Sequence, residues 1–476
     1  MSSVSTSFPQ RQSTQINKTP LFTCCSLHPL PLLAVAGGGG SSKTGIQNTI
    51  NLETAKFTSP TDVTTVHEIP TGELICTALA VAALSDDHVL LAAATAATCD
   101  IYVVSRSSKA VSCTSVASFK CCDDEQGINS MCFSSDSSLL VLGSERGDVA
   151  IFKLTALPTT PSSPAPLTVT SIATVPGAHS KAPVCAVCFI SPSQFDTGGK
   201  DGFLRLWDVQ NDALASPPTG SSSHQITIPP PKPVPGARPE NARQKELNKQ
   251  VMVRCLSYNP STNIIYTVSS GRRGGSYLHK WSPTSPASLS TTCVNNEYPS
   301  SSLTSIARED AKHSTYTVLC VGGVDGSVRS FIDFHKDKGE VLAFTGDPLE
   351  PGRGLGLFGV RGAGVVECHD LPITAICRGS GEGVDVVSVS ADAKTVRIKV
   401  YGKTVAAGNP LASWLFVFLV ILVAMYLKVV SESYCGGSTL SLKTHVACVG
   451  RVVKSIVGGE MGLLEPLRSV VQNKVI

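Results

Sequence analysis

The stretch Gly-Gly-Lys-Asp-Gly-Phe-Leu-Arg-Leu-Trp-Asp-Val, residues 198–209, decides the fold of this chain. Asp201 and Gly202 form a strong hairpin signal, because these residue types tolerate the positive φ angles that a tight antiparallel turn requires. Branched and aromatic side chains, such as Phe203 and Trp207, follow the turn, as is typical of strands in a packed sheet. The stretch therefore predicts a β-hairpin.

The same pattern is close to the second half of a WD repeat, and looser copies recur along the chain. They lie at residues 91–102, 142–152, 269–281, 321–331 and 388–398. A seventh copy surrounds a run of glycines, with expected strands at residues 32–36 and 46–52. Repeats of this kind stack as blades around a central channel. We therefore predict an all-β fold, a seven-bladed WD-repeat β-propeller.

The glycine run consists of Gly37, Gly38, Gly39 and Gly40. Each glycine costs about 0.5–1 kcal/mol relative to alanine in regular structure, so such a run is expected where backbone must turn tightly or approach a ligand. The expected loop at residues 39–45 is longer than the turn at residues 200–202. The first blade therefore projects an enlarged loop, a suitable place for a working element.

A phosphate-binding loop is one reading of this segment. Gly37 and Ser42-Lys43-Thr44 come within one substitution of the P-loop pattern, which has glycine where Ser42 stands. A P-loop also needs a helix directly after Lys43-Thr44, whereas Ile46, Ile50 and Leu52 follow strand spacing. The sequence favours a strand, and a P-loop NTPase is kept as a rival that direct nucleotide binding would test.

Residues 36–48, from Ala36 to Asn48, are very similar to the glycine-rich loop of a known family. It comprises the endoplasmic reticulum membrane exchange factors for the Sar-type small GTPase of the COPII coat, the prolactin regulatory element-binding protein family. The match includes the four glycines, Lys43-Thr44-Gly45-Ile46 and Asn48. The resemblance implies a guanine nucleotide exchange factor that promotes GDP release, initiating COPII vesicle coat assembly and ER-to-Golgi transport. Such a protein performs no covalent chemistry.

The resemblance also implies roles for individual residues. A potassium ion would be held mainly by backbone carbonyls of Gly37, Gly38, Gly39 and Gly40, and Asn48 would add an oxygen or brace the loop. Ile46 would wedge against the GTPase, while Lys43 and Thr44 would contact its switch region. Two alternatives stay open: these residues only support a long hairpin, or the protein is a membrane-anchored WD-repeat scaffold without exchange activity.

Composition bounds the remaining classes of function. The chain has 476 residues and a net charge of +3, which is too small and dispersed to argue for nucleic acid. The name of the resembled family suggests DNA binding, but the sequence contains no helix-turn-helix, basic helix or metal finger, so we expect no nucleic-acid partner. His179, His279 and His369 are isolated from other catalytic residue types, and we expect them to make structural hydrogen bonds.

Residues 404–427 carry no charge and are long enough for a single transmembrane helix. Trp414 and Tyr426 lie near its ends, where aromatic rings favour the membrane interface. More lysine and arginine precede the segment than follow it, so the positive-inside rule predicts a single-pass type II protein of the endoplasmic reticulum membrane. Residues 1–403 would form the cytosolic propeller, and residues 431–476 a short lumenal tail.

Two insertions and the cysteines complete the prediction. Residues 157–166 and 213–250 are rich in proline and polar residues, so we expect loops that are disordered at least in part. Fifteen of the 17 cysteines precede the membrane segment, which fits reduced thiols in the cytosol. Cys435 and Cys448 lie in the tail, and whether they pair is open. Cys185 and Cys188 would point to opposite faces of a strand and therefore could not share a metal.

Overall fold

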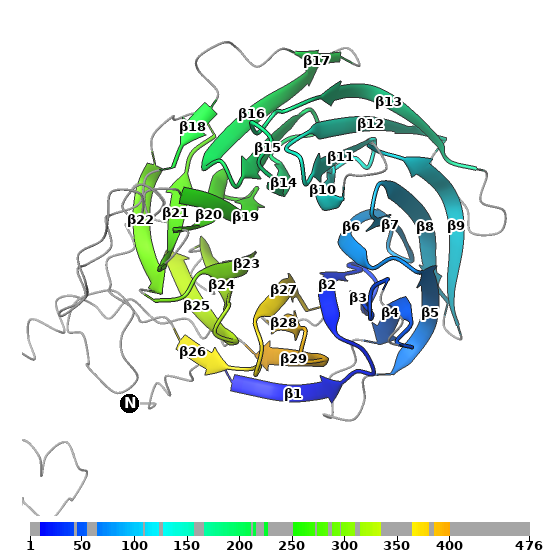
Figure 1. Ribbon diagram of the computed structural model, residues 1–476, viewed down its shortest axis with the longest axis horizontal. Helices are drawn as coiled ribbons and strands as arrows, with labels where there is room; N and C mark the ends of the chain where they lie inside the picture. Colours follow the sequence, from blue (N-terminus) through cyan, green and yellow to red (C-terminus); the bar gives the residue numbers. More distant parts are fainter. Residues whose placement is uncertain are drawn as a thin grey trace, which may run out of the picture. The chain divides into compact units, whose positions relative to one another are not determined.

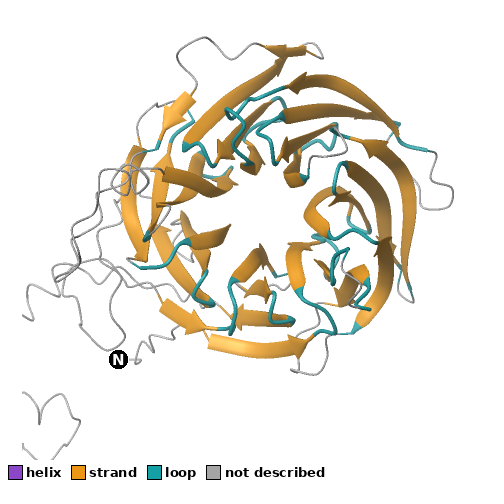
Figure 2. Ribbon diagram, in the orientation of Figure 1, coloured by secondary structure: helices purple, strands orange, loops and turns teal. Residues whose placement is uncertain are grey.

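A computed structural model describes most of the propeller region and no residue after 399. The described residues are 10–41, 45–54, 64–107, 110–122, 127–156, 166–210, 213–215, 223–226, 251–271, 274–283, 288–295, 297–309, 315–334, 364–379 and 385–399. They all belong to the first of two compact units, Met1–Thr404 and Val405–Ile476. Within this described part every regular element is a strand (Figure 2).

The strands form seven antiparallel sheets arranged as a ring of blades (Figure 1). The blade that carries the glycine run has the order β2(Leu21–Ser26), β3(Leu32–Gly37), β4(Asn48–Thr54), β5(Thr65–Gly72). The next three contain β6(Cys76–Ser85), β7(His88–Thr95), β8(Thr98–Arg106), β9(Val111–Lys120); β10(Ile128–Phe133), β11(Leu139–Ser144), β12(Val149–Thr155), β13(Thr168–Val175); and β14(Val184–Phe189), β15(Gln194–Gly199), β16(Phe203–Gln210), β17(Ala213–Ala215), β18(Ser223–Gln225).

The remaining three blades complete the ring. They contain β19(Val251–Asn259), β20(Ile264–Gly271), β21(Ser276–Trp281), β22(Ser288–Asn295); β23(Ser300–Glu309), β24(Thr315–Gly323), β25(Ser327–Phe334), β26(Gly364–Glu367); and β27(Ile373–Arg378), β28(Asp385–Ser390), β29(Lys394–Lys399), β1(Gln10–Ile16). The predicted seven-bladed all-β propeller is confirmed, and each predicted hairpin joins the second and third strands of a blade.

The first strand closes the ring. β1 pairs with β29, with Ile16 opposite Lys394, and so supplies the fourth strand of the last blade. The backbone N–H of Asn17 donates to the carbonyl of Ala393 at 2.7 Å, and Asn17 Nδ2 donates to Thr395 Oγ1 at 2.9 Å. Both ends of the propeller region are thereby held in one sheet.

Burial follows the position of a strand within its blade. The second strands, such as β3, β11 and β20, are buried along their whole length. They are covered on both faces by neighbouring blades, which is why they read as nearly continuous apolar runs rather than alternating patterns. Outer strands such as β9 and β13 alternate between exposed and half-buried positions.

A buried polar network supports the turn at residues 200–202. Trp207 Nε1 donates to Thr197 Oγ1 at 2.8 Å, which leaves the Thr197 hydroxyl hydrogen for His179 Nε2, also at 2.8 Å. His179 Nδ1 then lies 2.9 Å from Asp201 Oδ1. Arg205 Nη1 also lies 2.6 Å from Nδ1, and burial lowers the pKa of His179, which favours the neutral ring. The expected structural role of this histidine is confirmed.

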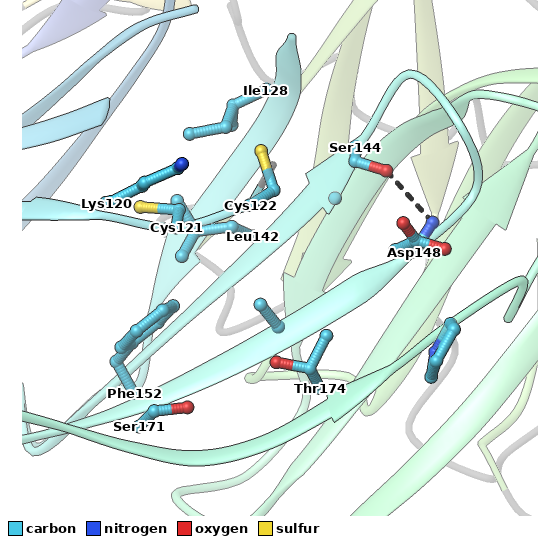
Figure 3. A pocket seen from close by; sticks show the side chains of 13 residues that line it. Lys120, Cys121, Cys122, Ile128, Leu142, Ser144, Asp148, Phe152, Ser171 and Thr174 are labelled. Carbon is cyan, nitrogen blue, oxygen red and sulfur yellow. Dashed lines mark hydrogen bonds between the residues drawn. The ribbon is translucent and has the colours of Figure 1, made fainter. Parts of the chain in front are cut away.

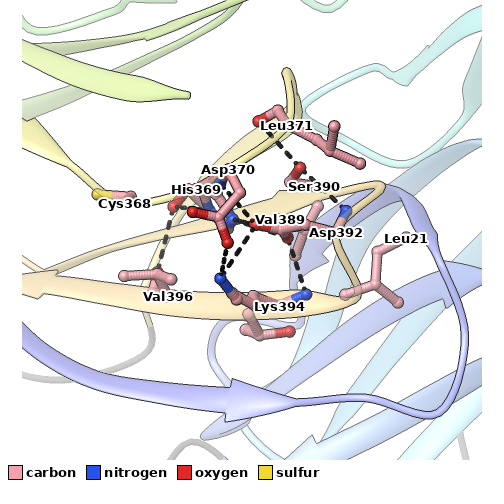
Figure 4. Close-up of polar contacts among 12 residues, drawn as sticks. Leu21, Cys368, His369, Asp370, Leu371, Val389, Ser390, Asp392, Lys394 and Val396 are labelled. Carbon is pink, nitrogen blue, oxygen red and sulfur yellow. Dashed lines mark hydrogen bonds and ion pairs between the residues drawn. The ribbon is translucent and has the colours of Figure 1, made fainter. Parts of the chain in front are cut away.

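The other two singled-out histidines are also structural. His279 Nε2 lies 2.6 Å from Ser269 Oγ, and burial lowers its pKa to about 4. His369 lies between Asp392 and Ser388, at 3.1 Å from Nδ1 to Oδ1 and 2.9 Å from Nε2 to Oγ (Figure 4). None of the three is near a group of potential metal ligands within the described ranges.

Several predictions fall partly or wholly outside the described residues. No helix in the described part is long and apolar enough to cross a membrane, and the predicted segment 404–427 lies beyond it. The tail 431–476, with Cys435 and Cys448, and residues 157–165 are likewise outside. Inside the predicted insertion 213–250, β17 and β18 both pair with β16.

Candidate functional site

The candidate site is the connection between β3 and β4, which carries the glycine run. The strand predicted from residue 46 begins at Asn48 instead, and the preceding strand extends to Gly37. Asn48 is the first residue with a ladder partner, Gly72 of β5. Gly45 adopts a φ of +73°, which an extended strand does not allow. Ile46 therefore belongs to the connection and not to the strand.

Asn48 braces this connection through hydrogen bonds of its side chain. Its Oδ1 accepts a hydrogen bond from the N–H of Gly40 at 2.9 Å, and its Nδ2 donates to the carbonyl of Gly40 at 3.3 Å. Nδ2 also donates to the carbonyl of Gly72 at 3.0 Å. The residue is only 3% exposed. Of the two roles expected for Asn48, the structure shows the bracing one.

Gly37 and Gly38 lie too close to neighbouring atoms to carry a side chain. A Cβ on Gly37 would lie 2.0 Å from the carbonyl oxygen of Pro20. Gly38 has a φ of +154°, and a Cβ there would lie 2.0 Å from Asn48 Oδ1 and 2.6 Å from Asn48 Cα. The N–H of Gly38 donates to the carbonyl of Pro20 at 3.0 Å. Any side chain at these positions would push the loop away from Asn48 and from the connection before β2.

The later part of the loop turns outward. Gly40 has a φ of +73°, and a Cβ there would lie 3.3 Å from Ile75 Cδ1. Gly45 has the same φ, and no atom of the described residues lies within 4 Å of a Cβ built there. Ile46 follows and is 37% exposed, so the loop presents an apolar side chain to solvent. Lys43 and Thr44, predicted to contact a partner, lie outside the described residues.

The oxygen atoms at this site are neutral. Asn48 Oδ1 is buried against Gly38 and Gly40, and it has a second lone pair beyond the one that accepts the Gly40 N–H. Amide and backbone carbonyl oxygens are the ligands that proteins use for potassium. The donor set therefore fits a bare monovalent cation, held by Asn48 and carbonyls of the glycine run, better than a divalent metal.

A second connection belongs to the site and was missed by sequence reasoning. The segment after β5 follows Gly72, the last residue of that strand, which has a φ of +71° and accepts the hydrogen bond from Asn48. Thr71 Oγ1 donates to the carbonyl of Leu74 at 2.8 Å and closes the turn. Leu74 itself is 46% exposed. The Thr-Gly pair was the only local signal of this turn, and nothing nearby in sequence links it to residue 48.

A cavity of about 540 Å³ lies on the blade of β10–β13, beside the end of β9 (Figure 3). Lys120 and Cys122 line it at one end, and Asp148, whose N–H donates to Ser144 Oγ at 3.0 Å, lines it at the other. Phe152 forms part of its apolar wall. None of the residues predicted for the functional site lines this cavity.

Comparison with known proteins identifies the repeats. The family described as WD domain, G-beta repeat, matches residues 113–153 and 170–208. Each match starts in the outer strand of one blade and ends in the third strand of the next, from β9 to β12 and from β13 to β16. The repeat in sequence is therefore offset by one strand from the blade, which explains why β1 completes the last sheet.

Solved structures share the fold at low sequence identity. Raptor from Chaetomium thermophilum is 14% identical with a TM-score of 0.51, over 83% of this chain and 29% of Raptor. Sqt1 from Chaetomium thermophilum, solved with the N-terminus of ribosomal protein L10, is 15% identical with a TM-score of 0.50, over 82% of this chain and 100% of Sqt1. This chain thus corresponds to less than a third of Raptor. No curated protein sequence matches it. The matched repeats and the seven sheets show that the chain is a seven-bladed WD-repeat β-propeller.

Proposed function

We propose that this protein is a guanine nucleotide exchange factor for a Sar-type small GTPase at the endoplasmic reticulum membrane. It would promote GDP release and so initiate COPII coat assembly and ER-to-Golgi transport. The observation that carries the proposal is the braced glycine loop. Its sequence resembles the exchange loop of that family, Asn48 is hydrogen-bonded to Gly40 and Gly72, and Ile46 is exposed.

The loop would act by differential binding and without covalent chemistry. An exchange factor binds the nucleotide-free GTPase more tightly than the nucleotide-bound form, and reciprocity requires that it weaken nucleotide affinity by the same factor. Switch segments of small GTPases are ordered by contacts to phosphate and Mg²⁺. An inserted apolar side chain such as Ile46 would displace such a segment, and Lys43 and Thr44 would contact it. The hydrogen bonds from Asn48 to this loop would reduce the ordering cost on binding.

A potassium ion and a membrane anchor belong to the same proposal. Potassium would be held by carbonyls of the glycine run with Asn48, and it would stiffen the loop when bound. Residues 404–427 would span the membrane once, with the propeller in the cytosol, where the GTPase acts. Exchange should then be faster in potassium than in sodium, and equal rates in both salts would argue against the ion.

The test uses the full chain and a GTPase loaded with fluorescent GDP. The chain should accelerate release many-fold, and Ile46→Ala should reduce the acceleration at least tenfold, about 1.4 kcal/mol. The rival is a membrane-anchored scaffold, favoured by the structure of Sqt1, a similar propeller that holds a segment of another protein. A scaffold would bind the GTPase equally in its nucleotide-bound and nucleotide-free forms and would leave release unchanged.

A further inference from the structure

One face of the propeller can be defined from its topology. Because neighbouring strands in each blade are antiparallel, the connection between the second and third strands lies on the same face as the connection leading to the next blade. We call this the glycine-loop face, since the connection between β3 and β4 lies on it. Six exposed apolar side chains lie in connections or at a strand end on this face, and we call them the apolar arc: Ile16, Ile46, Leu74, Tyr298, Val324 and Leu371.

The arc occupies three neighbouring blades. These are β23–β26, β27–β29 with β1, and β2–β5, which lie next to one another in Figure 1. On the same face of the blades β6–β9, β10–β13 and β14–β18, no large apolar side chain of the described residues is comparably exposed. The other exposed large apolar residues lie on outer strands, at Val66 of β5, Leu289 of β22 and Val365 of β26.

At one end of the arc, Ile46 and Leu74 are held on a common support. Asn48 and Gly72 are ladder partners, joined further by the hydrogen bond from Asn48 Nδ2. Ile46 is two positions from Asn48, and Leu74 is two positions from Gly72. With about 3.8 Å between successive Cα atoms and about 5 Å across the ladder, the Cα atoms of Ile46 and Leu74 are at most ~20 Å apart. One partner surface can cover both.

The arc continues through the closing strand. The N–H of Gly38 donates to Pro20 in the connection between β1 and β2, and Asn17 in that connection donates to Ala393. Ile16, the last residue of β1, pairs with Lys394 of the last blade, and the connection that follows it reaches the glycine loop at Pro20. Backbone hydrogen bonds join these connections directly, so their relative positions are set by the closed ring.

Leu371 is presented by a rigid turn in the next connection. Ser390 Oγ donates to the carbonyl of Pro372 at 2.8 Å and lies 3.2 Å from the carbonyl of Leu371, and the N–H of Asp370 donates to Asp392 Oδ2 at 3.0 Å. Figure 4 shows the Leu371 side chain lying apart from this polar cluster. The side chain is 46% exposed, the same fraction as Leu74.

Tyr298 and Val324 end the arc. The N–H of Val324 donates to the carbonyl of Pro299 at 3.0 Å, so the connection that carries Tyr298 lies against the one that carries Val324. The N–H of His369 donates to Gly326 at 3.1 Å, which joins this pair to the Leu371 turn. The arc is thus a hydrogen-bonded series of connections, each exposing an apolar side chain.

Charged side chains are exposed on both parts of this face. Lys120, Glu145, Arg146, Lys181 and Lys200 are exposed on the opposite part, and Lys18, Glu73, Glu297 and Asp370 on the connections that carry the arc. The exposed apolar side chains therefore distinguish the arc from the rest of the face, whereas the charges do not. An apolar protein surface that engages Ile46 finds its further apolar contacts along the arc.

We infer that the GTPase docks along the apolar arc, from Ile46 across Leu74 and Ile16 to Leu371, Val324 and Tyr298. This inference rests on the proposed exchange function, and it assigns a docking role to residues outside the glycine loop. Ile46 would act on the nucleotide site, while Leu74 and Leu371 would contribute affinity. Burial of an exposed apolar side chain against a partner removes apolar surface from water and so contributes favourably to binding.

The test compares three substitutions in the full chain: Leu74→Asp, Leu371→Asp and, as a matched control, Leu289→Asp. Leu289 is a leucine of similar exposure, 41%, on the outer strand β22. The first two should each weaken binding of nucleotide-free Sar-type GTPase by about tenfold or more. Their exchange rates should recover at saturating propeller, whereas Ile46→Ala should lower the maximal rate. Leu289→Asp should match the wild type in both measurements, and thermal unfolding checks that all variants are folded.

Failure of the inference is distinguishable from failure of the proposed function. If Ile46→Ala is defective but Leu74→Asp and Leu371→Asp bind like the wild type, the GTPase docks elsewhere and the exchange function stands. If Leu289→Asp is as weak as the two arc variants, binding is not confined to the arc and the inference is overturned. If the wild-type chain neither binds nucleotide-free GTPase nor accelerates GDP release, the exchange function fails and the docking inference fails with it.

Discussion

Replacing Asn48 by alanine removes the brace of the glycine loop and leaves the seven blades in place. The substitution deletes three hydrogen bonds, two with Gly40 and one with Gly72. Each is worth about 1 kcal/mol net, but Gly72 is exposed and Gly40 half-buried, so water replaces part of the loss. The expected cost to the loop is about 2 kcal/mol, which lowers the melting temperature of a domain of this size by about 3 °C.

The effect on exchange should exceed the effect on stability. A loss of about 2 kcal/mol in loop ordering corresponds to a decrease in exchange rate of up to about 30-fold. The assay is fluorescent GDP release from a Sar-type GTPase, with thermal unfolding of the same sample. Asn51→Ala is the matched control, because Asn51 lies on the same strand and its Oδ1 accepts no hydrogen bond from any described group. It should leave exchange unchanged.

Three results would contradict this reasoning in different ways. A melting temperature lowered by a few degrees with a wild-type exchange rate would mean that the brace is structural and that the loop is not the exchange element. A wild-type melting temperature together with a wild-type rate would mean that these three hydrogen bonds do not hold the loop. Equal losses in the Asn48 and Asn51 variants would indicate a nonspecific effect on β4.

Three further predictions concern stability and reactivity. Gly38→Ala should abolish exchange and lower the melting temperature more than Gly45→Ala. A Cβ at Gly38 collides with Asn48, whereas a Cβ at Gly45 meets no atom of the described residues within 4 Å. Equal effects of the two substitutions in thermal unfolding would contradict this. Burial raises the pKa of Glu53 from 4.5 to about 7. Its contribution to the free energy of unfolding is therefore fully present below pH 4.5 and is lost as the pH rises through 7. The free energy of unfolding of Glu53→Gln should therefore exceed that of the wild type by up to about 3 kcal/mol at pH 8 and by little at pH 4.5. A difference between the two proteins that does not change with pH in denaturant unfolding would refute this prediction. The Cys24 thiol donates to Cys377 Sγ at 3.5 Å, and this hydrogen bond together with burial raises the pKa of Cys24. Iodoacetamide should therefore modify Cys24 only after unfolding. Modification of the native protein at pH 8, detected by mass spectrometry, would contradict this packing.

Much of the fold could be predicted because its signals are short-range. A turn such as Asp201-Gly202, with strand-forming residues on either side, specifies a hairpin regardless of the rest of the chain. Repetition of that signal then indicates the blade number, and the structure confirms seven sheets. The structural role of His179 was also predictable, since an isolated histidine beside a turn most often satisfies a local hydrogen bond.

The elements that sequence reasoning missed depend on long-range contacts. β1 has no copy of the hairpin pattern, and its partner strand is far along the chain, as the hydrogen bond between Asn17 and Thr395 across 378 positions shows. The start of β4 was placed two residues early because Ile46 fits strand periodicity, whereas Asn48 is the first residue that pairs with β5. The link from Asn48 to Gly72 has no sequence signal, and with it the exposed Leu74 was overlooked.

The central claim is tested most directly by GDP release from a Sar-type small GTPase in the presence of the purified full chain. The account predicts that the folded chain accelerates release of fluorescent GDP many-fold and that Ile46→Ala removes at least nine-tenths of the acceleration, about 1.4 kcal/mol. A folded wild-type chain that leaves the release rate unchanged would contradict the exchange function, and an Ile46→Ala variant as active as the wild type would contradict the assignment of the loop.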